Sequence, residues 1–298
     1  MYGRAMRDIQ FSYADASDPL IKRLAIRVVE ALIGQPRLKR LYHEALAQPV
    51  AAESFFKAVV QGLKLDICYD AAQLAQVPRS GPLVVVANHA FGALDGIVLS
   101  RVVEEIRPDF LALINSVLLR VPELRANMLP VDFSGTLEAT QTNLHSRAKA
   151  RDHLAQGGAL IVFPSGTVAT SPDRLGLQPA VEVQWQPFAA QLIQRTQANV
   201  VPIFFSGQNS WLFQVVSHIS QTLRMALLFR EVKNRIGTVV PVAIGDPIPF
   251  STLVAFKDRQ ALINHLRQAT YALAERGSPP DSAPTAIGSD ALVGEPGA

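Results

Sequence analysis

The chain has 298 residues, of which 49% are hydrophobic, with one cysteine and a formal net charge of +3. This length and apolar content suit one large α/β domain with attachments, and the lone cysteine, Cys68, excludes an intramolecular disulfide. Every apolar run stops short of about 18 residues, so we expect no signal peptide and no membrane-spanning helix. No cysteine or histidine cluster has metal-ligand spacing, so we expect no metal site. The cysteine usage fits a reducing, cytosol-facing location.

An amphipathic helix is predicted at residues 18–33, and Gly34 and Pro36 end it. The basic side chains of this region indicate an anionic partner. Nucleic acid is disfavoured because aromatic residues are not interleaved with them and no helix-turn-helix or zinc signature is present, whereas an acidic lipid surface fits. The alternative is a helix packed on the core with a solvated charged face. The basic residues are Lys22, Arg23, Arg27, Arg37, Lys39 and Arg40.

Two further helices are predicted at about 37–47 and 51–63, so that residues 1–64 form an N-terminal helical segment that is a candidate for membrane contact. Residues 65–276 are predicted to form an α/β domain, because apolar runs typical of strands alternate with helical patterns at 136–156 and 186–196. This alternation predicts a largely parallel, mixed sheet flanked by helices. The runs are 65–69, 83–87, 110–114, 128–131, 159–163, 200–205 and 238–244.

The C-terminal residues 277–298 are rich in Pro, Gly, Ser and Ala and have no hydrophobic periodicity. Such a composition lacks the apolar side chains that a packed core requires. We therefore predict a disordered tail.

A histidine follows the second strand and precedes an aspartate by six positions. His89 comes directly after the apolar run 83–87 and Asn88, in the loop at the carboxyl edge of the sheet, where ligands usually bind. This pair suits removal of a proton from a hydroxyl by His89, with Asp95 fixing the tautomer and stabilising the imidazolium. The alternative is an ordinary loop histidine, with Asp95 as the N-cap of a helix at 96–105.

Two later turns also follow predicted strands. The run 159–163 leads into Phe163-Pro164-Ser165-Gly166-Thr167, and residues 200–205 contain Val201-Pro202-Ile203. Each alone is common turn chemistry.

In their order and spacing these blocks resemble the glycerolipid and lysophospholipid acyltransferase family (1-acylglycerol-3-phosphate acyltransferase-like). Its blocks are Asn-His followed by Asp, then Phe-Pro-Glu-Gly-Thr, then Val-Pro-Ile, and the match runs from about residue 83 to 249. The pattern Asn-His-x-Phe-Gly-x-Leu-Asp-Gly is similar to the hemolysin-like bacterial branch of that family. Its matching residues here are His89, Phe91, Gly92, Leu94, Asp95 and Gly96, supported by 207–210, 223–224 and 230–231.

The resemblance implies transfer of a fatty acyl group from an acyl thioester to the hydroxyl of a lysolipid, in membrane lipid biosynthesis. Acyl-CoA or acyl-ACP is then a co-substrate, and neither a further cofactor nor a metal is implied. His89 would deprotonate the hydroxyl without an acyl-enzyme intermediate, and backbone N–H groups near Gly92 or Gly166 are candidates for holding the oxyanion. Membrane lipids and acyl carrier protein are the implied partners, nucleic acid is not, and the expected location is peripheral, at the cytoplasmic face of the membrane.

Two departures from the family pattern bear on the acceptor. Ser165 replaces the family's Glu, and the stretch 129–135 lacks the Arg that would grip an acceptor phosphate. Arg120, Arg125 and Arg174 are candidate substitutes, or else solvated surface arginines. The missing Arg favours a lyso-aminolipid over lysophosphatidate. The residues predicted to bind substrate are Asn88, Gly92, Phe163, Pro164, Ser165, Gly166, Thr167, Arg174, Arg120, Arg125 and Pro202.

Other functions remain compatible with these residues. A non-catalytic lipid-binding or membrane-perturbing protein would need no dyad, and an acyl-thioester hydrolase would use the same base with water as acceptor. The aromatic residues Trp185, Trp211 and Phe213 fit an acyl tunnel, an interface or plain core packing.

Overall fold

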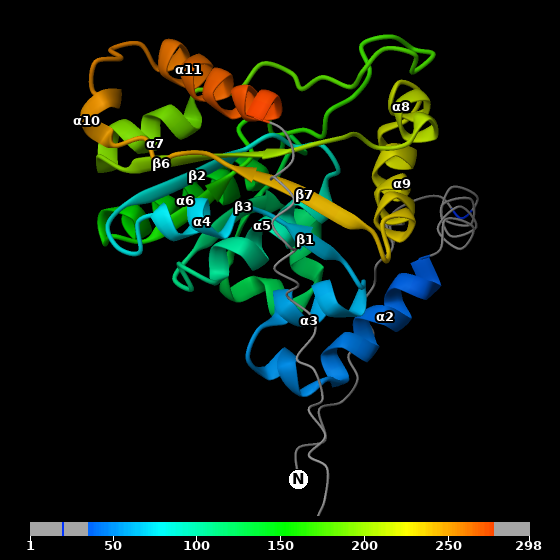
Figure 1. The fold of residues 1–298 in the computed structure, drawn as a ribbon. Coiled ribbons are helices and arrows are strands. Elements are labelled where there is room, and N and C mark those ends of the chain that lie inside the picture. The colour runs from blue at the N-terminus through cyan, green and yellow to red at the C-terminus, as the bar shows by residue number, and fades with distance from the viewer. Residues whose placement is uncertain (1–19, 21–34, 277–298) are drawn as a thin grey trace, which may run out of the picture.

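A seven-stranded sheet forms the centre of the protein in the computed structural model, which describes residues 20 and 35–276 (Figure 1). The strands lie in the order β1-β7-β6-β2-β5-β3-β4. Five neighbouring strands run parallel, whereas β7 is antiparallel to β6, and β1 is parallel to β7. The strands are β1 (Asp66–Cys68), β2 (Leu83–Ala87), β3 (Leu111–Asn115), β4 (Met128–Val131), β5 (Ala159–Val162), β6 (Asn199–Phe205) and β7 (Val239–Ile244).

The fold class predicted from the sequence is confirmed, because the sheet is mixed, largely parallel and flanked by helices. Each predicted strand is present, with ends within one residue of the expected ones. The helices are α2 (Gln35–Ala47), α3 (Phe55–Gly62), α4 (Ala71–Gln76), α5 (Ala93–Glu104), α6 (Leu137–Ala155), α7 (Phe188–Thr196), α8 (Trp211–Ser217), α9 (Gln221–Asn234), α10 (Phe250–Leu253) and α11 (Arg259–Ala272). Short 3-10 helices lie at Pro49–Ala52, Ser116–Arg120, Pro122–Ala126 and Leu273–Arg276.

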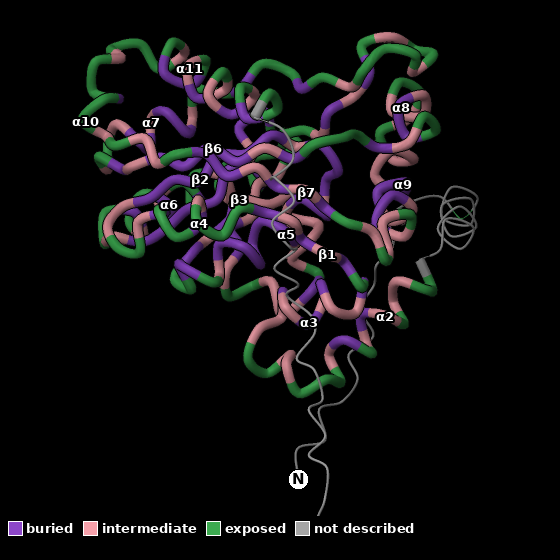
Figure 2. The backbone as a smooth tube through the Cα atoms, viewed as in Figure 1, coloured by how far each residue is buried: buried purple, intermediate pink, exposed green. Residues whose placement is uncertain are grey.

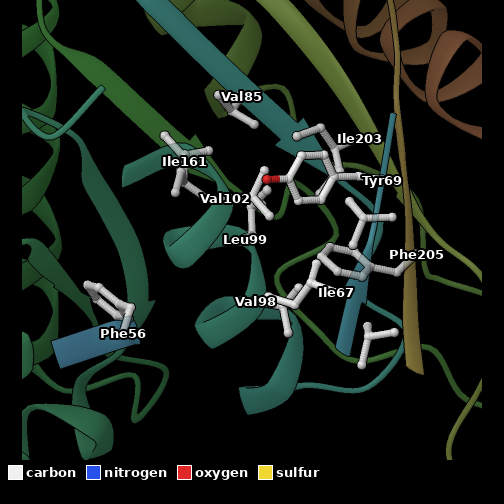
Figure 3. Packing of buried hydrophobic residues seen from close by; sticks show 14 of the residues in the cluster. Phe56, Ile67, Tyr69, Val85, Val98, Leu99, Val102, Ile161, Ile203 and Phe205 are labelled. Carbon is white, nitrogen blue, oxygen red and sulfur yellow. The ribbon is translucent and has the colours of Figure 1, made fainter. Parts of the chain in front are cut away.

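Both faces of the sheet are buried, as the nearly unbroken apolar strands require. Alternate residues of β2 point to opposite faces: Val85 packs with α5 in one cluster, whereas Val84 and Val86 pack with α6, α7 and α11 in the other. Figure 3 shows the first of these clusters, and Figure 2 shows the strands as the most deeply buried part of the fold.

The helix α3 belongs to the first cluster, because its Phe56 lies in it and packs against Phe110, with ring centroids 5.7 Å apart. The continuous helix predicted at 51–63 is wrong in its first part. Pro49 opens a 3-10 turn, and the hydroxyl of Ser54 then accepts the N–H of Lys57 and caps a new helix.

The structure corrects the alternative in which Asp95 is the cap of a helix at 96–105. Helix α5 begins at Ala93 with Gly92 as its cap residue, so Asp95 lies in the first helical turn. Its carboxylate accepts the N–H of Gly92, which is the position of an acidic residue in a capping box.

Some predictions fall on residues that the structure does not describe. The amphipathic helix at 18–33, with Lys22, Arg23 and Arg27, and the tail at 277–298 lie outside the described residues. Within residues 20 and 35–276, no helix combines the length and apolar content that crossing a bilayer takes. In the same part of the chain, no group of three His, Cys, Asp or Glu residues is placed to hold a metal ion.

Candidate active site

Three polar loops meet at the carboxyl edge of the parallel strands. Strand β2 pairs with β5 on one side and with β6 on the other. The loop that carries His89 therefore lies between the loop that begins at Phe163 and the loop that begins at residue 206. This edge is where an α/β sheet usually binds its ligand, as expected from the sequence.

His89 and Asp95 are in direct contact. The Nδ1 atom of His89 lies 3.0 Å from Oδ2 of Asp95; the histidine side chain is 19% exposed and the aspartate is fully buried. The N–H groups of Phe91 and Gly92 donate to the same oxygen, at 2.8 and 3.0 Å. With Nδ1–H donating to the carboxylate, Nε2 of His89 carries the lone pair that can take a proton.

Within the part of the chain that the structure describes, one oxygen of the Asp95 carboxylate is left without a partner. Its Oδ1 atom is buried and has no hydrogen-bond partner among the described residues. A carboxylate with one oxygen unpaired and out of water gains from a cation beside it. Protonated His89 would be that cation.

The ring of His89 is held in its plane by Phe163. The two rings stack with centroids 4.4 Å apart and planes 28° from parallel. Phe163 directly follows β5, so the sheet itself sets this contact. Of the residues predicted to bind substrate, Phe163 is the one that the structure places against the candidate base.

The backbone of His89 is also fixed, by a residue that the sequence did not single out. Its N–H donates to Oε1 of Glu182 at 2.8 Å, and its carbonyl accepts the N–H of Ala169 at 2.8 Å. Glu182 is buried, and its Oε2 accepts Nε1–H of Trp185 at 2.9 Å and the hydroxyl of Tyr271 at 2.7 Å. Burial and the Glu182 carboxylate raise the pKa of Tyr271, so its hydroxyl stays protonated and donates.

Sequence reasoning missed Glu182 because its carboxylate has no local signature. It lies between Val181 and Val183 in an irregular loop, and a buried glutamate cannot be told from a solvated one by its neighbours in sequence. Trp185 packs in the core, which was one of the three interpretations of this residue.

Other predicted binding residues are engaged in holding the loops together. The side-chain amide of Asn88 donates to the carbonyl of Phe205 at 2.9 Å and accepts its N–H at 2.7 Å, which ties the end of β2 to β6. The buried hydroxyl of Ser165 donates to the carbonyl of Thr167 at 2.9 Å and shapes the turn. Pro164 is buried beside it, and Pro202 is buried within β6.

The two candidate oxyanion donors are already hydrogen-bonded. The N–H of Gly92 donates to Asp95, and the N–H of Gly166 donates to the carbonyl of Phe163 at 3.0 Å. Either group would have to share or break that bond to hold an oxyanion. Gly92 has a φ of 87°, and a Cβ built on it would lie 2.8 Å from Leu228, so only glycine fits there.

The three predicted arginines lie on the surface, Arg120 and Arg125 in adjacent short helices and Arg174 in a different loop. Arg120 and Arg125 are exposed in the short helices after β3, where Arg125 donates to the carbonyl of Leu119, and Arg174 is exposed in the loop after β5. None of the contacts described for the dyad involves them.

Two other arginines lie nearer to the dyad. Arg224 of α9 donates to the carbonyl of Val168 at 2.6 Å, and burial lowers the pKa of its guanidinium. Arg235, just after α9, lies 4.2 Å over the ring of Phe91. The segments 223–224 and 230–231 were noted in the sequence as part of the family pattern, but Arg235 was missed.

Comparison with known proteins finds relatives of this chain. A family model described as "Acyltransferase" matches residues 40–277. A lyso-glycine lipid O-acyltransferase from Phocaeicola vulgatus is 24% identical over 249 residues, which cover 79% of this chain and 86% of that protein. The lyso-glycine lipid O-acyltransferase from Bacteroides thetaiotaomicron is 24% identical over 255 residues, covering 79% of this chain and 88% of its own length.

Among solved structures, the chain is similar to the crystal structure of the 1-acyl-sn-glycerophosphate acyltransferase PlsC from Thermotoga maritima. The superposition has a TM-score of 0.47 at 14% sequence identity and covers 86% of this chain and 96% of that chain.

Proposed function

Since the chain belongs to the acyltransferase family whose model matches it over residues 40–277, we propose that it moves a fatty acyl group from an acyl thioester to the hydroxyl of a lysolipid. The donor in this proposal is acyl-CoA or acyl-ACP. The acceptor is a lyso-aminolipid rather than lysophosphatidate. The names of the two lyso-glycine lipid O-acyltransferases support this choice, as does the lack of an Arg in the stretch 129–135.

The observation that carries the proposal is the contact between His89 and the buried carboxylate of Asp95. In the proposed reaction, Nε2 of His89 takes the proton of the acceptor hydroxyl while the hydroxyl oxygen bonds to the thioester carbonyl carbon. The tetrahedral intermediate then collapses, the carbon–sulfur bond breaks, and the leaving thiolate takes the proton back from His89. The base ends in its starting state, and no group of the protein is acylated.

The rest of the site fits the demands of such a step. The stack on Phe163 and the two backbone hydrogen bonds hold the imidazole in one orientation, which limits the entropy lost on reaching the transition state. The buried carboxylate beside it stabilises the imidazolium that forms.

An amino-acid head group would bring a carboxylate into the site, and a guanidinium suits it in bidentate fashion. Arg224 supports this proposal through its contact with Val168, which is next to Ala169, the loop residue that donates to the carbonyl of His89. Arg120, Arg125 and Arg174 stay predictions for the same task.

We propose a peripheral location at the cytoplasmic face of the membrane, where the lysolipid resides, with membrane lipids and acyl carrier protein as partners. The basic residues at 22–40 support this location through their attraction to anionic lipid, about 1 kcal/mol for each one near the surface.

The test is acyl transfer from labelled acyl-CoA and acyl-ACP into a panel of lysophospholipids and lyso-aminolipids. We expect a diacyl product, and we expect His89→Ala and Asp95→Asn to lower its rate about 10²–10⁴-fold. His145→Ala is the matched control, because His145 is exposed on α6 and its loss should leave the rate unchanged.

Two outcomes would contradict the proposal. Free fatty acid released in a His89-dependent way, without a lipid product, would make the protein a thioester hydrolase. Binding of lysolipid vesicles with no acylation by any donor would make it a lipid-binding protein.

A further inference from the structure

The large hydrophobic side chains that the structure leaves exposed are not spread evenly. More than half of those within residues 35–276 lie on two segments, the loop before α7 and helix α8 with the turn that follows it. We call these residues the apolar rim: Leu175, Leu177, Val181, Val183, Trp211, Leu212 and Ile219. Their exposures run from 37% for Leu212 to 76% for Leu177. Figure 2 shows the loop as an exposed arch beside α8.

The two segments of the rim are joined by hydrogen bonds. The indole N–H of Trp211 donates to the carbonyl of Leu175 at 2.7 Å, and Nε2 of His218 lies 2.9 Å from the carbonyl of Ser171. The N–H of Ala180 donates to the side chain of Gln208 at 2.8 Å. The rim is therefore one continuous surface at the upper right of Figure 1.

The loop that carries part of the rim is hydrogen-bonded to the candidate base at two points. Ala169 donates to the carbonyl of His89, and Glu182 accepts the N–H of His89. A pair of backbone hydrogen bonds between Thr170 and Val181 closes the loop between these two points. Whatever covers the rim thus lies next to the dyad.

The charges around the rim are predominantly positive. Arg174 is exposed within it, and the arginines and lysine on and just after α9 lie beside it: Arg224, Arg230, Lys233 and Arg235. Of the nearby carboxylates, Glu182 is buried, and Glu231 forms an ion pair with Arg230, whose Nη1 lies 3.5 Å from its Oε1. The side chain of Asp173 is bound to the N–H groups of Leu175, Leu177 and Gln178.

We propose that the apolar rim inserts into the boundary between head groups and acyl chains of an anionic phospholipid bilayer. The apolar side chains match the acyl chains of such a surface, and the neighbouring cations match its anionic head groups. The inference rests on the proposed function, because a lysolipid acceptor resides in the bilayer. An enzyme docked by the rim takes that lipid beside His89 without extracting it into water.

The two tryptophans of the chain make the test specific. Trp211 is 61% exposed on the rim, whereas Trp185 is buried in the core. On addition of vesicles of phosphatidylcholine and phosphatidylglycerol, we expect the emission of Trp211 to shift to shorter wavelength, and brominated acyl chains to quench it. Trp211→Phe should abolish both signals, and vesicles of phosphatidylcholine alone should bind more weakly, with a salt-sensitive difference.

The rim itself is tested with Leu175→Ser combined with Leu177→Ser. We expect vesicle affinity to fall about tenfold or more. The matched control removes two exposed side chains elsewhere, Leu144 on α6 and Val254 after α10, both 59% exposed. Leu144→Ser combined with Val254→Ser should bind vesicles like the wild type.

Acyl transfer separates this inference from the proposed function. The rim variant should acylate a short-chain, water-soluble lysolipid at the wild-type rate and lose activity only toward acceptor held in vesicles.

Failure of the wild type on both acceptors would refute the proposed function, while the fluorescence results would still decide the docking surface. Equal binding by the rim variant and its control would overturn the docking inference. Emission of Trp211 that is already blue-shifted without lipid would overturn it too, because another part of the chain or a second copy would then cover the rim.

Discussion

At the scale of single residues, the candidate base is held by two buried carboxylates with different tasks. Asp95 contacts Nδ1 of the imidazole ring, whereas Glu182 contacts only the backbone of His89. The contact with Glu182 fixes the backbone position of His89, and the stack on Phe163 fixes the orientation of its ring. A displacement of about 1 Å at a catalytic group can cost about 10²-fold in rate, so this backbone anchor matters for activity.

We predict that Glu182→Gln lowers both stability and kcat. One amide oxygen cannot accept from His89 and Trp185 in the places of two carboxylate oxygens, so one donor is left unpaired at a cost of about 1–3 kcal/mol. The free energy of unfolding from denaturant titration and the kcat for acyl transfer are the measurements. Tyr271→Phe is the graded control: it removes one donor of the set and should cost less than about 1.5 kcal/mol with kcat nearly unchanged. A kcat of wild-type size in Glu182→Gln would refute the anchoring role.

At the scale of elements, the loop that carries the rim depends on one side chain. The N–H of Gln178 donates to Asp173 at 2.7 Å, and the N–H groups of Leu175 and Leu177 donate to its other oxygen. These hydrogen bonds, that from Gln178 first, hold the pKa of Asp173 at about 2, below its ordinary value of 3.8.

We predict that Asp173→Asn speeds hydrogen exchange at the amides of Leu175, Leu177 and Gln178, because an amide nitrogen cannot accept their N–H groups. In the wild type, the depressed pKa of Asp173 sets the direction in which the stability of the loop depends on pH. The support of the loop is complete above the ordinary value near 4 and is lost as the pH falls through about 2. Trp211, which donates to Leu175, reports this step by its emission. An acid transition of Trp211 that persists in Asp173→Asn would show that another group controls the loop.

The strands were predictable from the sequence because their runs of β-branched and apolar residues are short, dense and ended by turn residues. The helix at 51–63 was misjudged at its start, since the apolar spacing of the segment continues through the cap at Ser54. The antiparallel pairing of β7 with β6 was not predictable, because it depends on how the chain between them returns across the edge of the sheet.

Within the candidate site, the residues in sequence blocks were predictable and those brought in from afar were not. His89 and Phe163 follow strand ends and Asp95 lies in the first turn of the next helix, where pattern alone locates them, and the structure brings them together. Glu182, Tyr271 and Arg235 come from irregular segments or distant helices. Their place depends on packing between elements, which a local pattern does not encode.

At the scale of the whole molecule, the opposite edge of the sheet is secured by a buried arginine. Arg107 is 1% exposed and donates to the carbonyls of Pro78, Gly81 and Gly157 and to both oxygens of Asp109. These carbonyls precede β2 and β5, and Arg107 itself precedes β3, so one guanidinium joins the starts of three neighbouring strands.

We predict that Arg107→Met destabilises the protein by about 3 kcal/mol and leaves kcat unchanged, because buried carbonyls lose their donor far from the dyad. For a chain of this size that is a drop in Tm of roughly 5 °C. Arg107 also lowers the pKa of Asp109, so its contribution is present at neutral pH and is lost as the pH falls through that lowered value. Calorimetry at several pH values measures both effects. Asp109→Asn is the control and should cost less than about 1 kcal/mol, since its carboxylate is 45% exposed.

The pairing of β1 with β7 has a consequence for how the protein is made. Asp66 pairs with Val239, so β1, the first of the described strands, meets its neighbour in the sheet only after roughly 170 further residues have been synthesised. At 5–20 residues per second, β1 waits roughly 10–35 s for that neighbour. During this interval the apolar side chains of α3 and β1 lack their final partners. Completion of the sheet is thus a late event in folding, because β7 can insert between β6 and β1 only after it has been synthesised.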